Sequence, residues 1–297
     1  MLSPAKINLG LKILYKRPDQ YHELESVFLK LNWGDDIEFV ENDSGKIRLV
    51  SQNELSGIKY NLFEEVSERG DFTKNILFKT FEKVKTHLDS NLGIDVHLTK
   101  RIPPGGGVGG GSSNAASLLT FLATKLSNEK RNLIMDFAPK IGADIPFFLR
   151  PGHFLVSGIG EVLKPIQVAS GFGILAIPPF SISTKESYLS LKKPLQTDWV
   201  QKSWNLLDEA STVALAQGDW AKLQDRFEND FERYAFSEFS ELEMLKQSLY
   251  KSGCSYVSMT GTGSCVYGFV QDRDHGTDIL KKMTQNYPKH YFIQFSF

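Results

Sequence analysis

Apolar and polar residues alternate along the first part of the chain. In an extended conformation its apolar side chains share one face: Ile7, Leu9, Leu11 and Ile13. The other face carries Lys6, Asn8, Gly10 and Lys12. The pattern predicts a strand with one buried face. Taken alone, its polar positions are typical of the outer surface of an edge strand, with Lys6 and Asn8 on the same side.

The rest of the chain predicts a mixture of strands and helices. Short apolar runs predict strands at 26–31, 36–40, 46–51, 94–100, 153–157, 172–177, 255–259 and 265–270 and at the end of the chain. Apolar spacings of three and four predict helices over 76–88, from about 112, over 132–141 and 274–286, and across most of 198–251. Because strands and helices do not alternate strictly, we expect an α+β fold with two domains, 1–160 and 161–297.

Composition and charge narrow the class of protein. A length of 297 residues suits two domains. The net charge of −1 gives no reason to expect nucleic acid or a membrane surface as a partner. Two cysteines, Cys254 and Cys265, suggest free thiols in a reducing compartment, although their spacing would permit a disulfide. No continuous apolar segment resembles a signal peptide or a membrane span, so we expect a cytoplasmic globular protein.

The run PPGGGVGGGSSNAA at 103–116 is the most informative feature. Six of the seven residues from Gly105 to Gly111 lack a side chain, so this backbone can adopt positive φ and approach a ligand closely. A helical pattern begins directly after it. The N–H groups of a helix N-terminus are unpaired and attract anions. The run therefore predicts a loop that holds phosphate.

The glycine run is also compatible with a dinucleotide site or with a turn that binds nothing. It satisfies the G-x-G-x-x-G pattern of dinucleotide-binding folds, but a helix tail reading NEKRN stands where an acidic strand end would be required. A P-loop would need lysine in place of Ser112. A turn without a ligand is disfavoured because glycine loses more conformational entropy on folding than other residues. Each ordered glycine reduces stability by about 0.5–1 kcal/mol relative to alanine.

Four further candidates have ordinary structural roles when each is taken alone. Tyr21 and His22 follow a turn-like segment, and Asp144 could cap a short helix that begins near Pro146. The segment GTGS at 261–264 is typical of a tight turn between two strands.

The order of the motifs changes this picture. PAKINL at 4–9, the YH pair, the glycine run, IGADIPFF at 141–148 and MTGTGS at 259–264 occur in one chain. In this combination the chain resembles the GHMP kinase superfamily, named for galactokinase and homoserine, mevalonate and phosphomevalonate kinases. The resemblance extends from Pro4 to about Val270. It implies the two-domain α+β GHMP kinase fold: an N-terminal nucleotide domain of the ribosomal protein S5 domain 2-like type and a ferredoxin-like C-terminal domain, with the active site in the cleft between them.

The resemblance also implies the roles of particular residues in phosphate transfer from ATP. It assigns ATP binding to Asn75, near the adenine, and to Pro104, Gly105, Gly106, Gly107, Val108, Gly109, Gly110, Gly111, Ser112 and Ser113. It makes Lys6 and Asp144 the catalytic pair. Phosphoryl transfer depends mostly on positioning and charge stabilisation. Asp144 would accept the proton of the acceptor alcohol, while Lys6 would keep that carboxylate ionised and steady the developing negative charge.

Within the superfamily the match is closest to a kinase whose acceptor alcohol carries a cytidine diphosphate. The implied acceptor is cytidine diphosphate methylerythritol, phosphorylated on its 2-hydroxyl in the non-mevalonate route to isoprenoid precursors. His22 would bond the edge of the cytosine, and the rings of Tyr21 and Tyr188 would pack on it. The resemblance assigns further substrate contacts to Asn8, Thr184, Gly261, Thr262 and Gly263.

Some features of the chain are not assigned by the resemblance. Segment 43–74 is longer than is usual in the family, and the link between the helix after the glycine run and Asp144 is compact. Mg²⁺ is expected with ATP, but no metal-ligand spacing identifies its site. We expect small-molecule partners, and a monomer or homodimer. The alternatives are a homoserine or mevalonate kinase, which the YH pair and Tyr188 disfavour, and an inactive ligand-binding relative, which Lys6 and Asp144 disfavour.

Overall fold

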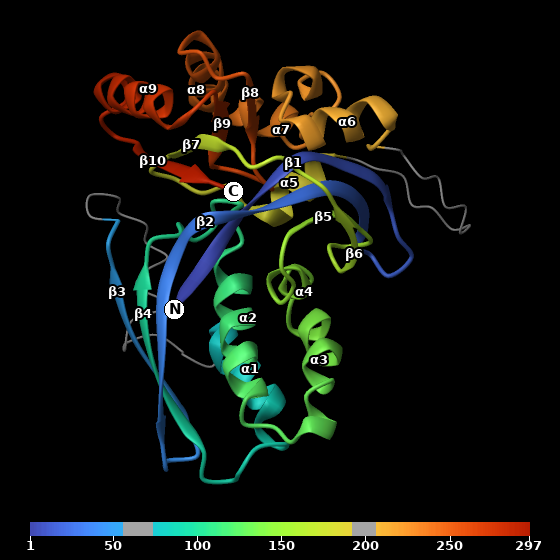
Figure 1. Ribbon diagram of the computed structural model, residues 1–297, viewed down its shortest axis with the longest axis vertical. Helices are drawn as coiled ribbons and strands as arrows, with labels where there is room; N and C mark the ends of the chain where they lie inside the picture. The colour runs from blue at the N-terminus through green and yellow to red at the C-terminus, as the bar shows by residue number, and fades with distance from the viewer. Residues whose placement is uncertain (56–73, 192–205) are drawn as a thin grey trace. The chain divides into compact units, whose positions relative to one another are not determined.

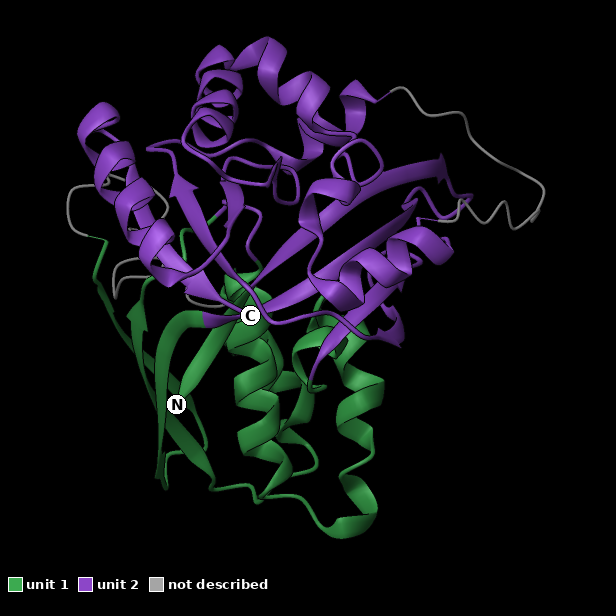
Figure 2. Cartoon of the chain, turned by 45° about the horizontal axis from the view of Figure 1, so that its top comes forward, with its two compact units in different colours: residues 1–5, 33–104, 109–151 green, residues 6–32, 105–108, 152–297 purple. Residues whose placement is uncertain are grey.

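The computed structural model describes residues 1–55, 74–191 and 206–297. These residues form two compact units (Figure 2). Unit 1 comprises 1–5, 33–104 and 109–151, and unit 2 comprises 6–32, 105–108 and 152–297. Neither unit is continuous in sequence, because the strands β1 (Leu2–Lys16) and β2 (His22–Asn42) carry residues of both. The contiguous division at residue 160 stays a prediction. Much of the irregular segment 43–74, and the beginning of the helical region expected from residue 198, lie outside the described residues.

Unit 1 packs helices against a small sheet (Figure 1). The later half of β2 pairs antiparallel with β4 (Gly93–Lys100), which pairs parallel with β3 (Ile47–Asn53). The helical elements of this unit are α1 (Ile76–Lys85), α2 (Gly110–Ala123), the 3-10 helix η3 (Asn128–Lys130), α3 (Leu133–Ile141) and α4 (Ile145–Phe148). The helices expected over 76–88 and 132–141 are confirmed, and Gly142 directly follows the last residue of α3.

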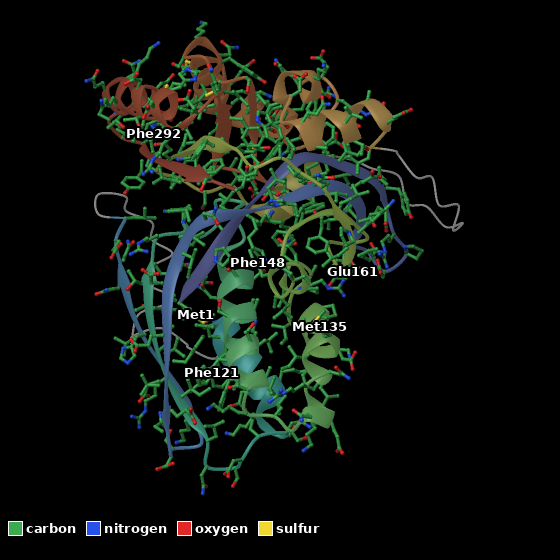
Figure 3. All side chains as sticks on the ribbon, viewed as in Figure 1. Met1, Phe121, Met135, Phe148, Glu161 and Phe292 are labelled. Carbon is green, nitrogen blue, oxygen red and sulfur yellow. The ribbon has the colours of Figure 1, made fainter. Side chains whose placement is uncertain are left out.

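The core of unit 1 comes from the apolar faces that the periodicity predicts. Phe81 and Val84 of α1 are fully buried, as are Leu118 and Leu122 of α2. Phe121 projects from α2 toward the strands (Figure 3), and its ring stacks on that of Phe39 in β2 with 5.0 Å between centroids. These contacts fix α2, whose N-terminus follows the glycine run.

Strand β2 corrects one expectation. The sequence predicted separate strands at 26–31 and 36–40, but the structure has one strand through both. A side chain on Gly34 would place its Cβ 2.1 Å from the carbonyl oxygen of Ser3. The glycine therefore allows β1 and β2 to approach closely, which is a role of glycine within strands rather than a turn signal.

Unit 2 contains a four-stranded antiparallel sheet. Its strand order is β10-β7-β9-β8, from β7 (Phe172–Ile177), β8 (Tyr256–Met259), β9 (Val266–Val270) and β10 (Tyr291–Ser296). The helical elements are α5 (Thr184–Ser190), α6 (Glu209–Gln217), the 3-10 helix η4 (Trp220–Leu223), α7 (Glu232–Glu238), α8 (Ser240–Lys251) and α9 (Arg273–Asn286). Helices α8 and α9 contact this sheet (Figure 1). A helical segment precedes β8, and α9 connects β9 to β10, so the expected ferredoxin-like arrangement is confirmed.

Two further strands of unit 2 continue the sheet from the early half of β2. This half pairs antiparallel with β5 (His153–Ser157), and β5 pairs with β6 (Val162–Ile166), a strand that the sequence did not predict. Cys254 and Cys265 are free and buried, as expected, and burial raises the pKa of the Cys254 thiol to about 12. None of the described helices is long and apolar enough to cross a membrane.

Candidate active site

Lys6 and Asn8 are not on an exposed edge, which corrects the simplest interpretation of their strand. Lys6 is 4% exposed and Asn8 is 2% exposed. The Lys6 Nζ donates to Asn8 Oδ1 at 2.5 Å and lies 4.6 Å from the ring centre of Phe28 on β2. Burying a lysine is costly unless its charge has partners. The contacts with Asn8 and Phe28 therefore hold the ammonium group of Lys6 in one place within the protein.

Asn8 is held by hydrogen bonds on both its main chain and its side chain. Its N–H donates to Thr260 Oγ1 at 3.1 Å, and its carbonyl accepts from the Tyr267 hydroxyl at 2.8 Å. Its Nδ2 donates to Ser26 Oγ at 3.1 Å. The Thr260 hydroxyl also lies 3.3 Å from Asn8 Oδ1. These bonds fix the amide oxygen that accepts the hydrogen bond from Lys6.

The first half of the glycine run belongs to unit 2 and packs against the same threonine. The Thr260 hydroxyl lies 3.1 Å from the carbonyl oxygen of Gly107. Gly107 has φ +77°, and a Cβ there would sit 2.1 Å from the carbonyl oxygen of Thr260. The N–H of Lys6 donates to the carbonyl of Val108 at 3.0 Å, and that of Cys265 to Gly106 at 3.3 Å. Thr260 thus connects the loop to the strand that carries Lys6.

The second half of the run belongs to unit 1 and begins helix α2. Gly109 is the residue before the helix and has φ +75°. A Cβ on Gly110 would lie 2.7 Å from Ile102 and 3.3 Å from Lys100 Nζ. Lys100 forms a buried ion pair with Asp35, which also accepts the N–H of Arg101 at 2.7 Å and of Ile102 at 2.8 Å. The ammonium group of Lys100 therefore lies beside the first turn of α2, with its charge balanced by Asp35.

The serines after the glycines differ in exposure. Ser112 is partly exposed, whereas Ser113 is buried and its hydroxyl lies 2.9 Å from that of Ser3. The N–H of Ser113 donates to the carbonyl of Gly109 at 2.9 Å, within the helix. Of the two serines, Ser112 is thus the more accessible to a ligand.

Asp144 lies in unit 1, directly before α4. The helix begins at Ile145 with Pro146 in its first turn, as expected, but the Asp144 side chain makes no capping hydrogen bond to it. Asp144 therefore occupies the N-cap position, as one interpretation of the sequence expected, but its carboxylate does not act as the cap. Lys6 belongs to unit 2, and the pairing of these two residues stays a prediction.

The aromatic residues predicted to bind a base come together in unit 2. The rings of His22 and Tyr188 lie 4.9 Å apart at 34°, and Phe231 supports Tyr188 edge-on at 4.8 Å. Tyr21 is 59% exposed beside them. The main-chain N–H of Tyr21 donates a hydrogen bond to Asp19 Oδ1 at 3.1 Å, which fixes the turn before it.

A pocket of about 340 Å³ lies at these rings. Its lining residues are Lys16, Gln20, Tyr21, His22, Ile159, Lys185, Tyr188 and Leu189. The three residues that the resemblance assigned to base recognition therefore line one cavity, and Thr184, assigned as a further substrate contact, begins the helix that carries Tyr188. The hydroxyl of Thr184 lies 3.2 Å from that of Thr262, so the predicted substrate contacts on α5 and on the GTGS turn are also adjacent.

Sequence reasoning missed a residue that shapes the GTGS turn. Asn229 is buried, and its Nδ2 donates to the carbonyls of Met259 and Gly261, each at 2.8 Å. Gly261 has φ +57°, and Gly263 has φ +86°. Nothing in the local sequence around Asn229 signals this role, because it depends on contacts with residues about thirty positions later. Thr260 was also missed, although it stands directly before the turn.

Other predicted positions are described by their local contacts. Asn75 caps α1, where its Oδ1 accepts the N–H of Leu77 at 2.9 Å. Lys30 on β2 was not a predicted site residue; burial lowers its pKa to about 8.

Among the described residues, no group of three or more His, Cys, Asp or Glu side chains could hold a metal ion. Mg²⁺ in nucleotide sites usually retains waters and is held largely by phosphate oxygens, so such a group is not required.

Comparison with family models supports the motif-based resemblance. Residues 75–152 match the model for the GHMP kinases N terminal domain, and residues 211–289 match the model for the GHMP kinases C terminal region. These matches include the whole glycine run and Asp144 in the first case, and Thr260 with the GTGS turn in the second.

Similar proteins carry a more specific name. A 4-diphosphocytidyl-2-C-methyl-D-erythritol kinase of Leptospira interrogans is 47% identical over 100% of both chains. A protein of the same name from Chloroherpeton thalassium is 32% identical over 96% of this chain and 93% of its own.

Solved structures agree on the fold. A crystal structure of 4-(cytidine 5'-diphospho)-2C-methyl-D-erythritol kinase superposes with a TM-score of 0.77 at 26% identity, covering 100% of this chain and 98% of its own. The mevalonate kinase of L. major superposes with a TM-score of 0.71 at 16% identity, covering 99% and 94%. The second similarity is one of fold alone.

Proposed function

Because the chain belongs to the 4-diphosphocytidyl-2-C-methyl-D-erythritol kinases, a family of GHMP kinases, we propose that it transfers the γ-phosphoryl group of ATP to the 2-hydroxyl of 4-diphosphocytidyl-2-C-methyl-D-erythritol. The observation that carries the choice of acceptor is the pocket at His22, Tyr21 and Tyr188, whose rings suit a nucleobase. A mevalonate or homoserine kinase would have no use for such a pocket.

The glycine run binds the phosphates of ATP. Gly105, Gly107 and Gly109 have positive φ, which side-chain-bearing residues rarely adopt. The close packing at Gly107 and Gly110 leaves no room for a Cβ, so the bare backbone at these positions is required by the fold. At the start of α2, the N–H groups and the positive end of the helix favour an anion. Mg²⁺ bound to these phosphates would reduce their negative charge.

The chemical step needs a base and a stabilised charge. The 2-hydroxyl oxygen attacks the γ-phosphorus as the bond to the β,γ-bridging oxygen breaks, and the hydroxyl proton passes to the Asp144 carboxylate. ADP leaves with the bridging oxygen. Lys6, fixed by Asn8 and Phe28, supplies positive charge at the reacting oxygens. Asn8 acts mainly by holding this ammonium group, since its own polar atoms are bonded within the protein.

The acceptor test compares three alcohols. We expect the cytidylyl methylerythritol substrate to be phosphorylated far faster than mevalonate or homoserine, as measured by ADP release at equal concentrations. In Tyr188→Ala, the loss of an aromatic face that stacks on a base is worth about 1–3 kcal/mol, or about 5- to 150-fold in KM for the acceptor. The KM for ATP should be unchanged. Faster turnover of mevalonate by the unaltered protein would contradict the proposal.

Thr260 provides a separate prediction about how Lys6 is held. Thr260→Val keeps the shape of the side chain but leaves the buried N–H of Asn8 without its acceptor, at a cost of about 1–3 kcal/mol in the free energy of unfolding. Because the same hydroxyl contacts Gly107 and Asn8 Oδ1, kcat should fall by roughly tenfold or more, as a loss of about 1.4 kcal/mol in transition-state stabilisation would give.

Two variants serve as controls for this measurement. Thr260→Ser keeps the hydroxyl and should retain most of kcat. Thr284→Val removes an exposed hydroxyl that bonds only within α9, and it should match the unaltered protein. A Thr260→Val enzyme with normal kcat would show that Lys6 does not depend on this threonine.

A further inference from the structure

Two lysines from different elements line the pocket at His22 and Tyr188. Lys16 lies at the end of β1, and Lys185 lies in the first turn of α5. Both residues line the pocket, and among the described residues that line it there is no aspartate or glutamate. The whole chain has a net charge of −1, so a lining with lysines and no acidic residue departs from its average composition.

Arg17, the residue after Lys16, has its charge balanced by two carboxylates. Arg17 pairs with Asp19 at 3.0 Å and with Glu23 at 3.3 Å. Lys16 and Lys185 form no ion pair with another described residue. Their charges are therefore available to a ligand that enters the pocket.

Resting on the function proposed above, we infer that Lys16 and Lys185 recognise the diphosphate of the acceptor and make the enzyme select a nucleoside diphosphate over a nucleoside. The phosphates of a nucleoside diphosphate follow the ribose C5′ oxygen, so a ligand whose base lies at Tyr188 and His22 carries them next to the pocket that the long side chains of Lys16 and Lys185 line. Ammonium groups bind phosphate as point charges, without a demand for one geometry. Two lysines from separate elements thus suit a flexible diphosphate.

Acceptor binding then has two separable parts. Tyr21, His22 and Tyr188 bind the base, whereas Lys16 and Lys185 bind the negatively charged diphosphate. Cytidine and CDP share the base and ribose and differ only in the diphosphate, so their relative affinity isolates the contribution of the lysines. Neither compound needs to react, which allows binding to be measured without turnover.

The experiment titrates CDP and cytidine into the full-length protein by calorimetry. In the unaltered protein, CDP should bind more tightly than cytidine. In Lys16→Met and in Lys185→Met, the dissociation constant for CDP should rise about tenfold each, because a hydrogen bond to a charged group is worth about that much. The constant for cytidine should stay within about twofold, since it carries no phosphate for an ammonium group to bind. In the double variant, the affinity for CDP should also depend less on salt.

Lys281→Met is the control for the loss of a lysine elsewhere on the protein. Lys281 is exposed on α9, its ion-pair partner Asp278 is on the same helix, and its removal should leave both constants unchanged. An unchanged ratio of CDP to cytidine affinity in the double variant would overturn the role of the lysines while leaving the base pocket intact. A loss of ATP affinity instead would assign them to the donor. Failure of both CDP and cytidine to bind the unaltered protein would overturn the acceptor pocket itself, and the role of the lysines with it.

Discussion

Asp144→Ala removes turnover while leaving ATP affinity nearly unchanged: this is the expected result if Asp144 is the base. A general base contributes about 10²–10⁴-fold to a rate. In phosphoryl transfer that base accepts the proton of the attacking hydroxyl. The side chain makes no capping bond to α4, so its removal does not cost the helix a cap.

The measurement pairs single-turnover rates with ATP titration. Asp136→Ala is a matched control, because Asp136 is also an aspartate of unit 1 in the first turn of a helix, but it is exposed on α3. That variant should behave as the unaltered protein does in both assays. Normal turnover in Asp144→Ala would remove the base assignment. Loss of ATP affinity with normal turnover at saturation would make Asp144 a donor-binding residue instead.

Gly107→Ala is expected to weaken ATP binding by about 100-fold, the equivalent of about one or two hydrogen bonds to charged phosphate at about 1.5–3 kcal/mol each. The loop cannot keep its present form, because the new Cβ would lie 2.1 Å from the carbonyl oxygen of Thr260 and the residue has φ +77°. A non-glycine residue in this conformation costs about 1–2 kcal/mol even without a clash. Displacing the loop would move its N–H groups away from the phosphates.

Gly152→Ala separates the clash from the backbone strain. Gly152 also has positive φ, at +91°, but nothing lies within 4 Å of where its Cβ would be. Both variants should lose some thermal stability, whereas only Gly107→Ala should lose ATP affinity, as followed by calorimetry. Equal ATP affinity in the two variants would show that the apex of the loop does not set the phosphate site.

Local patterns were sufficient for much of the fold and for the choice of site residues. The spacing of Leu77, Phe81 and Val84 predicted α1, and each of these residues is buried as that spacing requires. The periodicity of α9 and the turn at GTGS were predicted equally well. In contrast, β6 was missed. Its sequence is VLKPI, in which a proline and a lysine interrupt the apolar pattern, and its residues are largely exposed.

The errors arose where the role of a residue depends on distant contacts. The strands expected separately at 26–31 and 36–40 are one strand, β2, in which Gly34 allows the close approach of the backbone at Ser3. Lys6 and Asn8 resembled an exposed polar face, yet they are enclosed by Phe28, Ser26, Thr260 and Tyr267. Each of these partners is distant in sequence, and no periodicity within β1 encodes them.

The sequence by itself determined most of the elements, the family and the chemistry available, because amphipathic spacing, glycine-rich turns and ordered motifs are local properties of a chain. Only the tertiary structure decided how those residues are held. It brought Thr260 to both Gly107 and Asn8, and it placed two lysines beside the rings of His22 and Tyr188. The physical reason is that burial, hydrogen bonding and the charge of a pocket depend on segments far apart in the chain, which become neighbours only in the folded protein.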